Sequence, residues 1–95
     1  MLRKDQKEKL INALYEELKN TPRLKNIKLI SNPNPNADIV EVTTWENMFT
    51  PHILNIFITL NQAGLIFTNK IDDIEDKNTK NKTIEYKDIY YFKFT

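Results

Sequence analysis

The sequence contains no cysteine, one glycine and one histidine among 95 residues. Without cysteine the chain has no disulfide bond, no thiolate nucleophile and no thiolate ligand for zinc, which agrees with a reducing compartment. A single glycine also excludes the glycine-rich loop that many phosphate-binding folds require. Packing alone must therefore stabilise the fold, and nucleotide hydrolysis through such a loop is excluded.

Long apolar runs are missing as well. No stretch of about 18 uncharged apolar residues is present, and the N-terminus lacks the pattern of a secretory signal peptide. We therefore expect a cytoplasmic protein that makes no contact with a membrane. A length of 95 residues, with 40% hydrophobic and 28% charged residues, is typical of one globular domain, so we expect a single domain over residues 1–95.

The net charge of +1 conceals an uneven distribution along the chain. Residues 1–28 carry eight basic and four acidic side chains, a net charge of +4. Residues 29–69 contain no lysine or arginine and only three acidic side chains. We predict that the middle of the chain supplies most of the core and that the basic excess at the start lies on the surface.

Three segments of the first half have clear patterns. Apolar residues at helical spacing predict an amphipathic helix over residues 4–20, which ends before Pro22. Residues 26–31 are a short strand candidate, and residues 37–44, which are rich in β-branched side chains, predict a second, antiparallel strand. The intervening residues 31–36, SNPNPN, predict an exposed reversal of the chain.

Residues 51–62 fit either a helix or a strand, because their apolar side chains are compatible with both periods. The ends of the segment favour a helix. Thr50 can cap it, Pro51 suits its first turn, and Gly64 lies where a left-handed residue commonly ends a helix. Several β-branched residues inside the segment favour a strand, so the alternative stays open.

The last third predicts two further strands. Residues 65–70 follow the Gly64 turn as a strand, residues 71–82 form a charged and mobile connection, and residues 83–95 form a long aromatic strand. The element order is then α-β-β-α-β-β. This order indicates an α+β fold, a two-layer sandwich in which one or two helices cover one face of an antiparallel sheet of about four strands.

Candidate catalytic groups are few. His52 has no carboxylate or nucleophile near it in sequence, and one histidine without cysteine does not make a zinc site. Asp73 followed by Glu85 and Lys87 has the spacing of metal-dependent restriction-type nucleases, but short patterns of common residues arise by chance. We expect no catalytic residues, no cofactor and a protein that is not an enzyme.

An acidic cluster in the last third is the other candidate for a metal site. Its carboxylates could hold a hard cation through oxygen ligands, but the order and the internal glycine of a calcium-binding loop are absent. We expect solvated loop charges and no metal. The cluster consists of Asp72, Asp73, Glu75 and Asp76.

Aromatic residues supply the best candidates for binding another macromolecule. Trp45, Phe49 and His52 surround the start of the second expected helix, where Thr43 and Glu46 also match a capping box. The terminal strand adds Tyr90 and Tyr91, which could engage a partner through strand addition or self-pairing at a sheet edge. These five residues are the candidate partner-binding residues.

The favoured function is therefore a small protein-binding module that contacts a protein partner or forms a homodimer. Lysine, isoleucine and asparagine are abundant, a bias typical of AT-rich coding DNA, so a phage or mobile-element accessory protein or inhibitor is one instance of that class. The alternative is a nucleic-acid-binding domain. It would use the basic Lys4, Lys7 and Arg23 together with the terminal aromatic strand.

Overall fold

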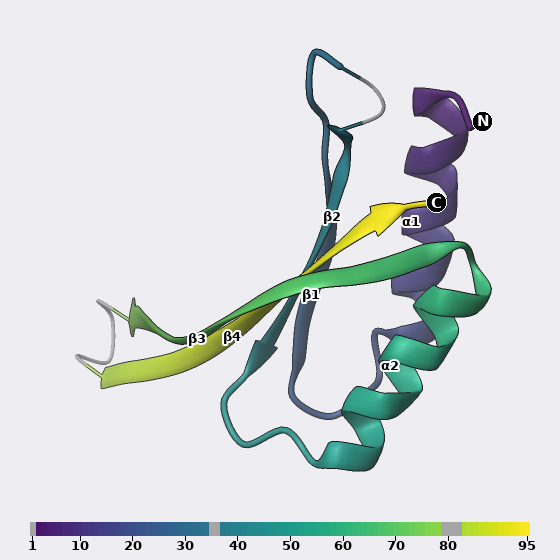
Figure 1. Ribbon diagram of the computed structural model, residues 1–95. Coiled ribbons are helices and arrows are strands. Elements are labelled where there is room, and N and C mark those ends of the chain that lie inside the picture. Colours follow the sequence, from purple (N-terminus) through teal and green to yellow (C-terminus); the bar gives the residue numbers. More distant parts are fainter. Residues whose placement is uncertain (1, 35–36, 79–82) are drawn as a thin grey trace.

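A computed structural model describes residues 2–34, 37–78 and 83–95. The chain forms an α+β fold with two helices and a four-stranded antiparallel sheet, in the expected order α-β-β-α-β-β (Figure 1). The helices are α1 (Lys4–Leu18) and α2 (Thr50–Gln62). The strands are β1 (Leu24–Ile30), β2 (Ile39–Trp45), β3 (Leu65–Asn78) and β4 (Thr83–Phe94).

Residues 51–62 are helical, which resolves the choice between helix and strand. Pro51 lies in the first turn of α2, where its missing N–H leaves no helical hydrogen bond unmade. Thr50 is the first helical residue rather than the cap, because Phe49 occupies the cap position without a side-chain hydrogen bond. Gly64 has a φ of +91°, the left-handed conformation expected after a helix end.

The strand order β1-β2-β4-β3 corrects two expectations. The terminal strand β4 lies inside the sheet between β2 and β3, so it is not an edge that a partner strand could extend. The expected mobile connection over residues 71–82 is also wrong for its first part, because β3 continues to Asn78. Residues 79–82 lie outside the described residues.

The long β3–β4 hairpin extends well beyond the two helices (Figure 1). Its outer part carries the exposed apolar side chains Ile71 and Ile84, 44% and 53% accessible. Two register shifts interrupt the pairing, one between Phe67 and Asn69 and one between Ile71 and Ile74. We call residues 70–78 of β3 and residues 83–87 of β4 the arm.

Both helices pack on the same face of the sheet. Side chains alternate between the two faces of a strand, so Val40 and Val42 share a face with their partners Phe92 and Tyr90. Those four residues form one buried cluster with side chains of both helices. The opposite face, which we call the open face, carries the alternate side chains of each strand. The helical members of the core are Ile11, Leu14, Leu18, Ile56 and Leu60.

The reversal between β1 and β2 is described only in part. Asn34 accepts a hydrogen bond from the backbone N–H of Ala37 at 2.9 Å, and Asn32 donates from its side chain to the Ala37 carbonyl at 2.6 Å. Residues 35 and 36 lie outside the described residues. The expected capping box of Thr43 and Glu46 is not formed, because Thr43 lies within β2 opposite Ile89.

Candidate functional site

The segment from residue 47 to residue 69 contains no lysine, arginine, aspartate or glutamate. It folds as α2 and the beginning of β3, and much of it lies on the surface. Leu54, Ile58 and Phe67 are 55%, 56% and 40% accessible. Exposed apolar side chains gathered in one place are a common property of protein interaction sites, whereas single ones are ordinary.

The helical period explains why α2 carries an exposed apolar flank. Ile56 and Leu60 face the core and are 2% and 0% accessible. Leu54 and Ile58 are four residues apart, so they lie one above the other on a flank of the helix away from the core. Phe57 lies between this flank and the core, where it is half-buried.

An aromatic cluster forms the base beneath this flank. The ring of Phe57 lies 5.1 Å from the Phe67 ring, 5.1 Å from the Phe92 ring and 5.5 Å from the Tyr90 ring, measured between centroids. Its contacts with Phe92 and Tyr90 are edge-to-face, an arrangement that aromatic pairs favour. The cluster fixes the position of Phe57 and Phe67 at the surface.

A hollow of about 410 Å³ opens between α2 and β3 above this cluster. Its walls are mostly apolar, and the amide side chains of Asn61 and Gln62 stand at its helical side. We call Leu54, Phe57, Ile58, Asn61, Gln62 and Phe67 the α2–β3 surface. The residues that line the hollow are Phe57, Ile58, Asn61, Gln62, Leu65, Phe67 and Phe92.

Sequence reasoning missed this surface. The signal was the uncharged middle of the chain, which we interpreted as core. That interpretation holds for Ile56, Leu60 and Leu65, which are buried, but fails for Leu54 and Ile58.

The structure does not bring the expected aromatic corner together. Phe49 is 65% accessible, and its ring lies 5.6 Å from that of His52 in an edge-on contact. Trp45 belongs to β2, and the alternation of side chains along that strand places it on the open face. The Lys25 ammonium lies 4.6 Å from the centre of its ring. Phe49 and His52 therefore contact each other at the start of α2, whereas Trp45 contacts Lys25.

The terminal tyrosines also separate. Tyr90 is 4% accessible and lies in the core beneath α2, so it offers no contact area to a partner. Tyr91 is half-buried on the open face, opposite Glu41 of β2 and Asn69 of β3. Neither tyrosine lies at a free edge, because β4 is an inner strand.

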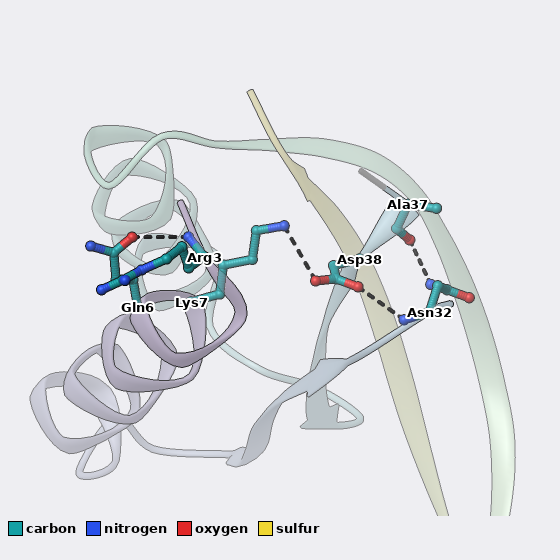
Figure 2. A network of polar contacts seen from close by, with 6 residues as sticks. All are labelled: Arg3, Gln6, Lys7, Asn32, Ala37 and Asp38. Atoms are coloured by element: carbon teal, nitrogen blue, oxygen red, sulfur yellow. Dashed lines mark hydrogen bonds and ion pairs between the residues drawn. The ribbon is translucent and has the colours of Figure 1, made fainter. Parts of the chain in front are cut away.

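Lys7 is withdrawn from the surface, contrary to its place in the nucleic-acid alternative. Its side chain is 3% accessible, and its Nζ lies 3.2 Å from Asp38 Oδ2 (Figure 2). The other carboxylate oxygen of Asp38 accepts the backbone N–H of Asn32 at 2.9 Å. The Asn32 hydrogen bond, aided by Lys7, lowers the pKa of Asp38 despite its burial.

Lys4 and Arg23 do not form a basic patch with each other. Lys4 is exposed at the start of α1, whereas Arg23 follows the end of that helix. Arg23 has a φ of +71°, and its guanidinium donates from Nε and Nη2 to the Glu46 carbonyl at 3.0 and 2.6 Å. That contact lies at a polar hollow of about 440 Å³ which Trp45 and Tyr86 also line.

Two members of the acidic cluster, Asp72 and Asp76, form ion pairs with lysines. Lys25 Nζ lies 2.5 Å from Asp76 Oδ2, and the Nζ of Lys87 lies 3.7 Å from the same oxygen. The Lys25 hydrogen bond lowers the pKa of Asp76. The backbone N–H of Asp73 donates to Asp88 Oδ1 at 3.1 Å.

The nuclease spacing does not produce a shared site in this geometry. Lys87 contacts Asp76 rather than Asp73, and Glu85 is opposite Asp76 in the hairpin. Among residues 2–34, 37–78 and 83–95, no group of three histidine or acidic side chains is placed to hold a metal ion.

Neither described helix is long and apolar enough to cross a membrane. No protein-family model matches this sequence, and no curated protein matches it.

Proposed function

We propose that this chain is a small, non-enzymatic protein-binding domain and that its partner docks on the α2–β3 surface. One observation carries the proposal: an uncharged segment, residues 47–69, places Leu54, Ile58 and Phe67 in solvent around an apolar hollow. The centres of protein interfaces are depleted in charged residues and enriched in aromatic ones. The α2–β3 surface has both properties.

Aromatic contacts also hold side chains of the α2–β3 surface in fixed positions. Phe57 and Phe67 are held by ring contacts to each other and to Phe92, which is 1% accessible. A rigid apolar site loses little conformational freedom when a partner docks, so more of the contact energy appears as affinity. The hollow can then receive an apolar side chain of the partner, the arrangement found at interface hot spots.

Site-specific photo-crosslinking tests this function. A photoreactive amino acid replaces Ile58 in the chain expressed in its source cells, and irradiation is followed by mass spectrometry of the adducts. We expect covalent adducts with protein. Ile84 provides the matched control, because it is an exposed isoleucine of similar accessibility, 53% against 56%, on the arm.

Two results would contradict the proposal. One is an absence of protein adducts at position 58. The other is an equal yield of the same adducts at positions 58 and 84, because chance collisions would label both exposed positions alike. A probe at Lys4 that crosslinks to nucleic acid, with no protein adduct at Ile58, would favour the nucleic-acid alternative instead.

A further inference from the structure

We infer that the free edge of β1 is a separate binding site, which takes an extended peptide as an added strand. The peptide carries an acidic residue between two apolar ones. The strand order places β1 at the opposite edge of the sheet from β3, so this site is distinct from the α2–β3 surface. The inference goes beyond the proposed function and does not depend on it.

The backbone of β1 supplies the main contacts. Among the described residues, β1 pairs only with β2. In an antiparallel pair every second residue directs its N–H and C=O away from the neighbouring strand, so β1 presents a row of donors and acceptors on its outer side. An extended peptide has the same repeat of donors and acceptors, and strand addition is a common mode of peptide recognition.

The edge of β1 is also the more regular of the two edges of the sheet. Its register with β2 is unbroken from Asn26 to Ile30, a run of five residue pairs. The register of β3, the other edge strand, shifts twice. Bulges of this kind protect an edge against pairing with a further strand. A partner strand therefore pairs better with β1 than with β3.

A hollow of about 310 Å³ follows this edge beside α1. Residues 26–29 of β1 line it together with Glu8, Ile11 and Asn12 of α1. Successive side chains of a strand point to opposite faces of the sheet, so four consecutive residues reach one hollow only where it runs along the backbone edge. Ile11 and Ile27, which are 2% and 5% accessible, supply its apolar part. The hollow therefore adjoins the backbone groups that an added strand would bind.

The strand that already pairs with β1 shows which side chains fit beside it. Residues 40–42 of β2, Val-Glu-Val, lie opposite residues 27–29 of β1, Ile-Lys-Leu, in reverse order. A strand added to the outer edge directs its side chains to the same two faces, next to the same three residues. Its apolar side chains then lie toward α1 and the hollow, and its acidic side chain lies beside Lys28 on the open face.

The charges on the two faces favour this alternation of side chains. Lys28 is exposed, and an acidic side chain opposite it in an added strand would stabilise the pairing. Glu8 lines the hollow on the side of α1, where it would repel an acidic side chain of the partner. Acidic residues of the peptide are therefore favoured on the open face and disfavoured on the face toward α1.

Charge also argues against a second copy of this chain as the occupant. The sequence of β1, LKNIKLI, contains two lysines and no acidic residue. A second β1 strand therefore brings no carboxylate to Lys28, in contrast to Glu41 of β2, which lies opposite it. A segment of another protein that alternates apolar and acidic residues is the better partner.

Binding of a short synthetic peptide tests the site. The probe is Thr-Val-Glu-Val-Thr with blocked ends, which reads the same in both directions and so places its glutamate opposite Lys28 in a parallel or an antiparallel strand. Nuclear magnetic resonance of the isotope-labelled chain at millimolar peptide follows each backbone amide. We expect shifts confined to residues 26–30 and the adjacent flank of α1, and slower hydrogen exchange at alternate amides of β1.

N-methylation of the peptide shows whether its backbone makes the contact. One peptide carries N-methyl groups on its two valines, and the other carries them on the glutamate and the two threonines. Alternate N–H groups of a strand point to opposite sides, so one set should abolish binding and the other should leave it nearly unchanged. Equal effects of the two sets would overturn strand addition.

A charge reversal in the chain tests the role of Lys28. Lys28→Glu should weaken binding of the probe by roughly twofold to fivefold and strengthen binding of Thr-Val-Lys-Val-Thr by a similar factor. Lys93→Glu is the matched control, because Lys93 is an exposed lysine of the open face on the inner strand β4. It should change neither affinity. Circular dichroism should show that both variants fold, since both side chains are exposed. Equal responses of the two variants would overturn the assigned role of Lys28.

The outcomes are distinguishable from those that test the proposed function. Peptide shifts confined to the α2–β3 surface, or no shifts at all, overturn the β1 site whatever adducts form at position 58. If hydrogen exchange of the β1 amides slows as the chain alone is concentrated, a second copy occupies the edge and the peptide is overturned as its occupant. A lack of protein adducts at position 58 removes the proposed function and leaves the β1 site standing, because the two surfaces lie at opposite edges of the sheet.

Discussion

Lys7 and Asp38 are 31 positions apart in the sequence, yet their side chains meet at 3.2 Å with accessibilities of 3% and 2% (Figure 2). The pair joins α1 to the start of β2. The lysine Nζ also lies 5.0 Å from the centre of the Phe94 ring. Removing two charges from water is costly, so such a pair must retain all its contacts to be tolerated in a core.

Replacing Lys7 with methionine should therefore destabilise the fold. Lys7→Met keeps most of the side-chain volume but leaves the Asp38 carboxylate buried without its cation, which costs about 3–5 kcal/mol in comparable pairs. The double variant Lys7→Met/Asp38→Asn should be more stable than the single one, because no charge remains and Asn can still accept the Asn32 N–H. Urea unfolding, followed by Trp45 fluorescence, measures the free energy of unfolding of the single and the double variant. A single variant as stable as the original chain would show that the pair contributes nothing.

Acid should weaken the fold through the same carboxylate. The Asn32 N–H and Lys7 lower the pKa of Asp38 in the folded chain below its usual value of about 3.9. Its contribution to stability is then complete above the unfolded pKa and is lost as the pH falls from about 5 through the folded pKa. The free energy of unfolding should decline over that range, and the decline should be smaller in Asp38→Asn.

Asp76 provides a comparison for that titration. Its pKa is also lowered, chiefly by the Lys25 hydrogen bond, but its side chain is 29% accessible and its partner 35%. Solvent screens such a pair, so Asp76→Asn should alter the acid dependence less than Asp38→Asn does. If the two variants changed the acid dependence of the free energy of unfolding equally, burial of the carboxylate would not explain its contribution to stability.

Gly64→Ala should cost about 1–2 kcal/mol, the penalty for a side chain in left-handed backbone. The reason is conformation and not space, because an added Cβ would lie 3.6 Å from Thr95 Oγ1, an ordinary contact. Gly64→Asn should cost less, since asparagine tolerates this conformation better. Thermal unfolding of the two variants compares them, and equal melting temperatures would contradict the conformational explanation.

Thr44→Val should stabilise the protein by about 1 kcal/mol. The Thr44 hydroxyl is buried, and within the described residues it has no hydrogen-bond partner, so its desolvation is not offset. Valine has nearly the same shape and carries a methyl group in place of that hydroxyl. Thr44→Ser is the control: it keeps the hydroxyl, loses a methyl group and should destabilise. A less stable valine variant would indicate that the hydroxyl is bonded in solution.

The sequence predicted most local structure because local chemistry determined it. The period of α1, the β-branched residues of β2, and the Pro51 and Gly64 signals around α2 all correspond to elements of the fold. The continuation of β3 to Asn78 was missed because its outer part is almost entirely solvent-exposed and carries charges in place of an apolar alternation. Its strand conformation comes from pairing with β4, a contact that lies beyond any local pattern.

The candidate site was harder to predict. Strand order is a property of the whole sheet, so nothing local indicated that Tyr90 would be covered by α2 and that β4 would be an inner strand. Lys7 was misplaced because its partner Asp38 is distant in sequence. The absence of charge along residues 47–69 was visible, but absence of charge does not distinguish a buried side chain from an exposed one.

The inner position of β4 sets an order of events during synthesis. The ribosome makes α1, β1, β2, α2 and β3 before the strand that must lie between β2 and β3. Until residues 83–94 emerge, β3 has no neighbour in the sheet and the first hairpin lacks its inner partner. The sheet therefore assembles after translation of its last strand, and a stop codon before residue 83 would leave two separated edges rather than a shortened domain.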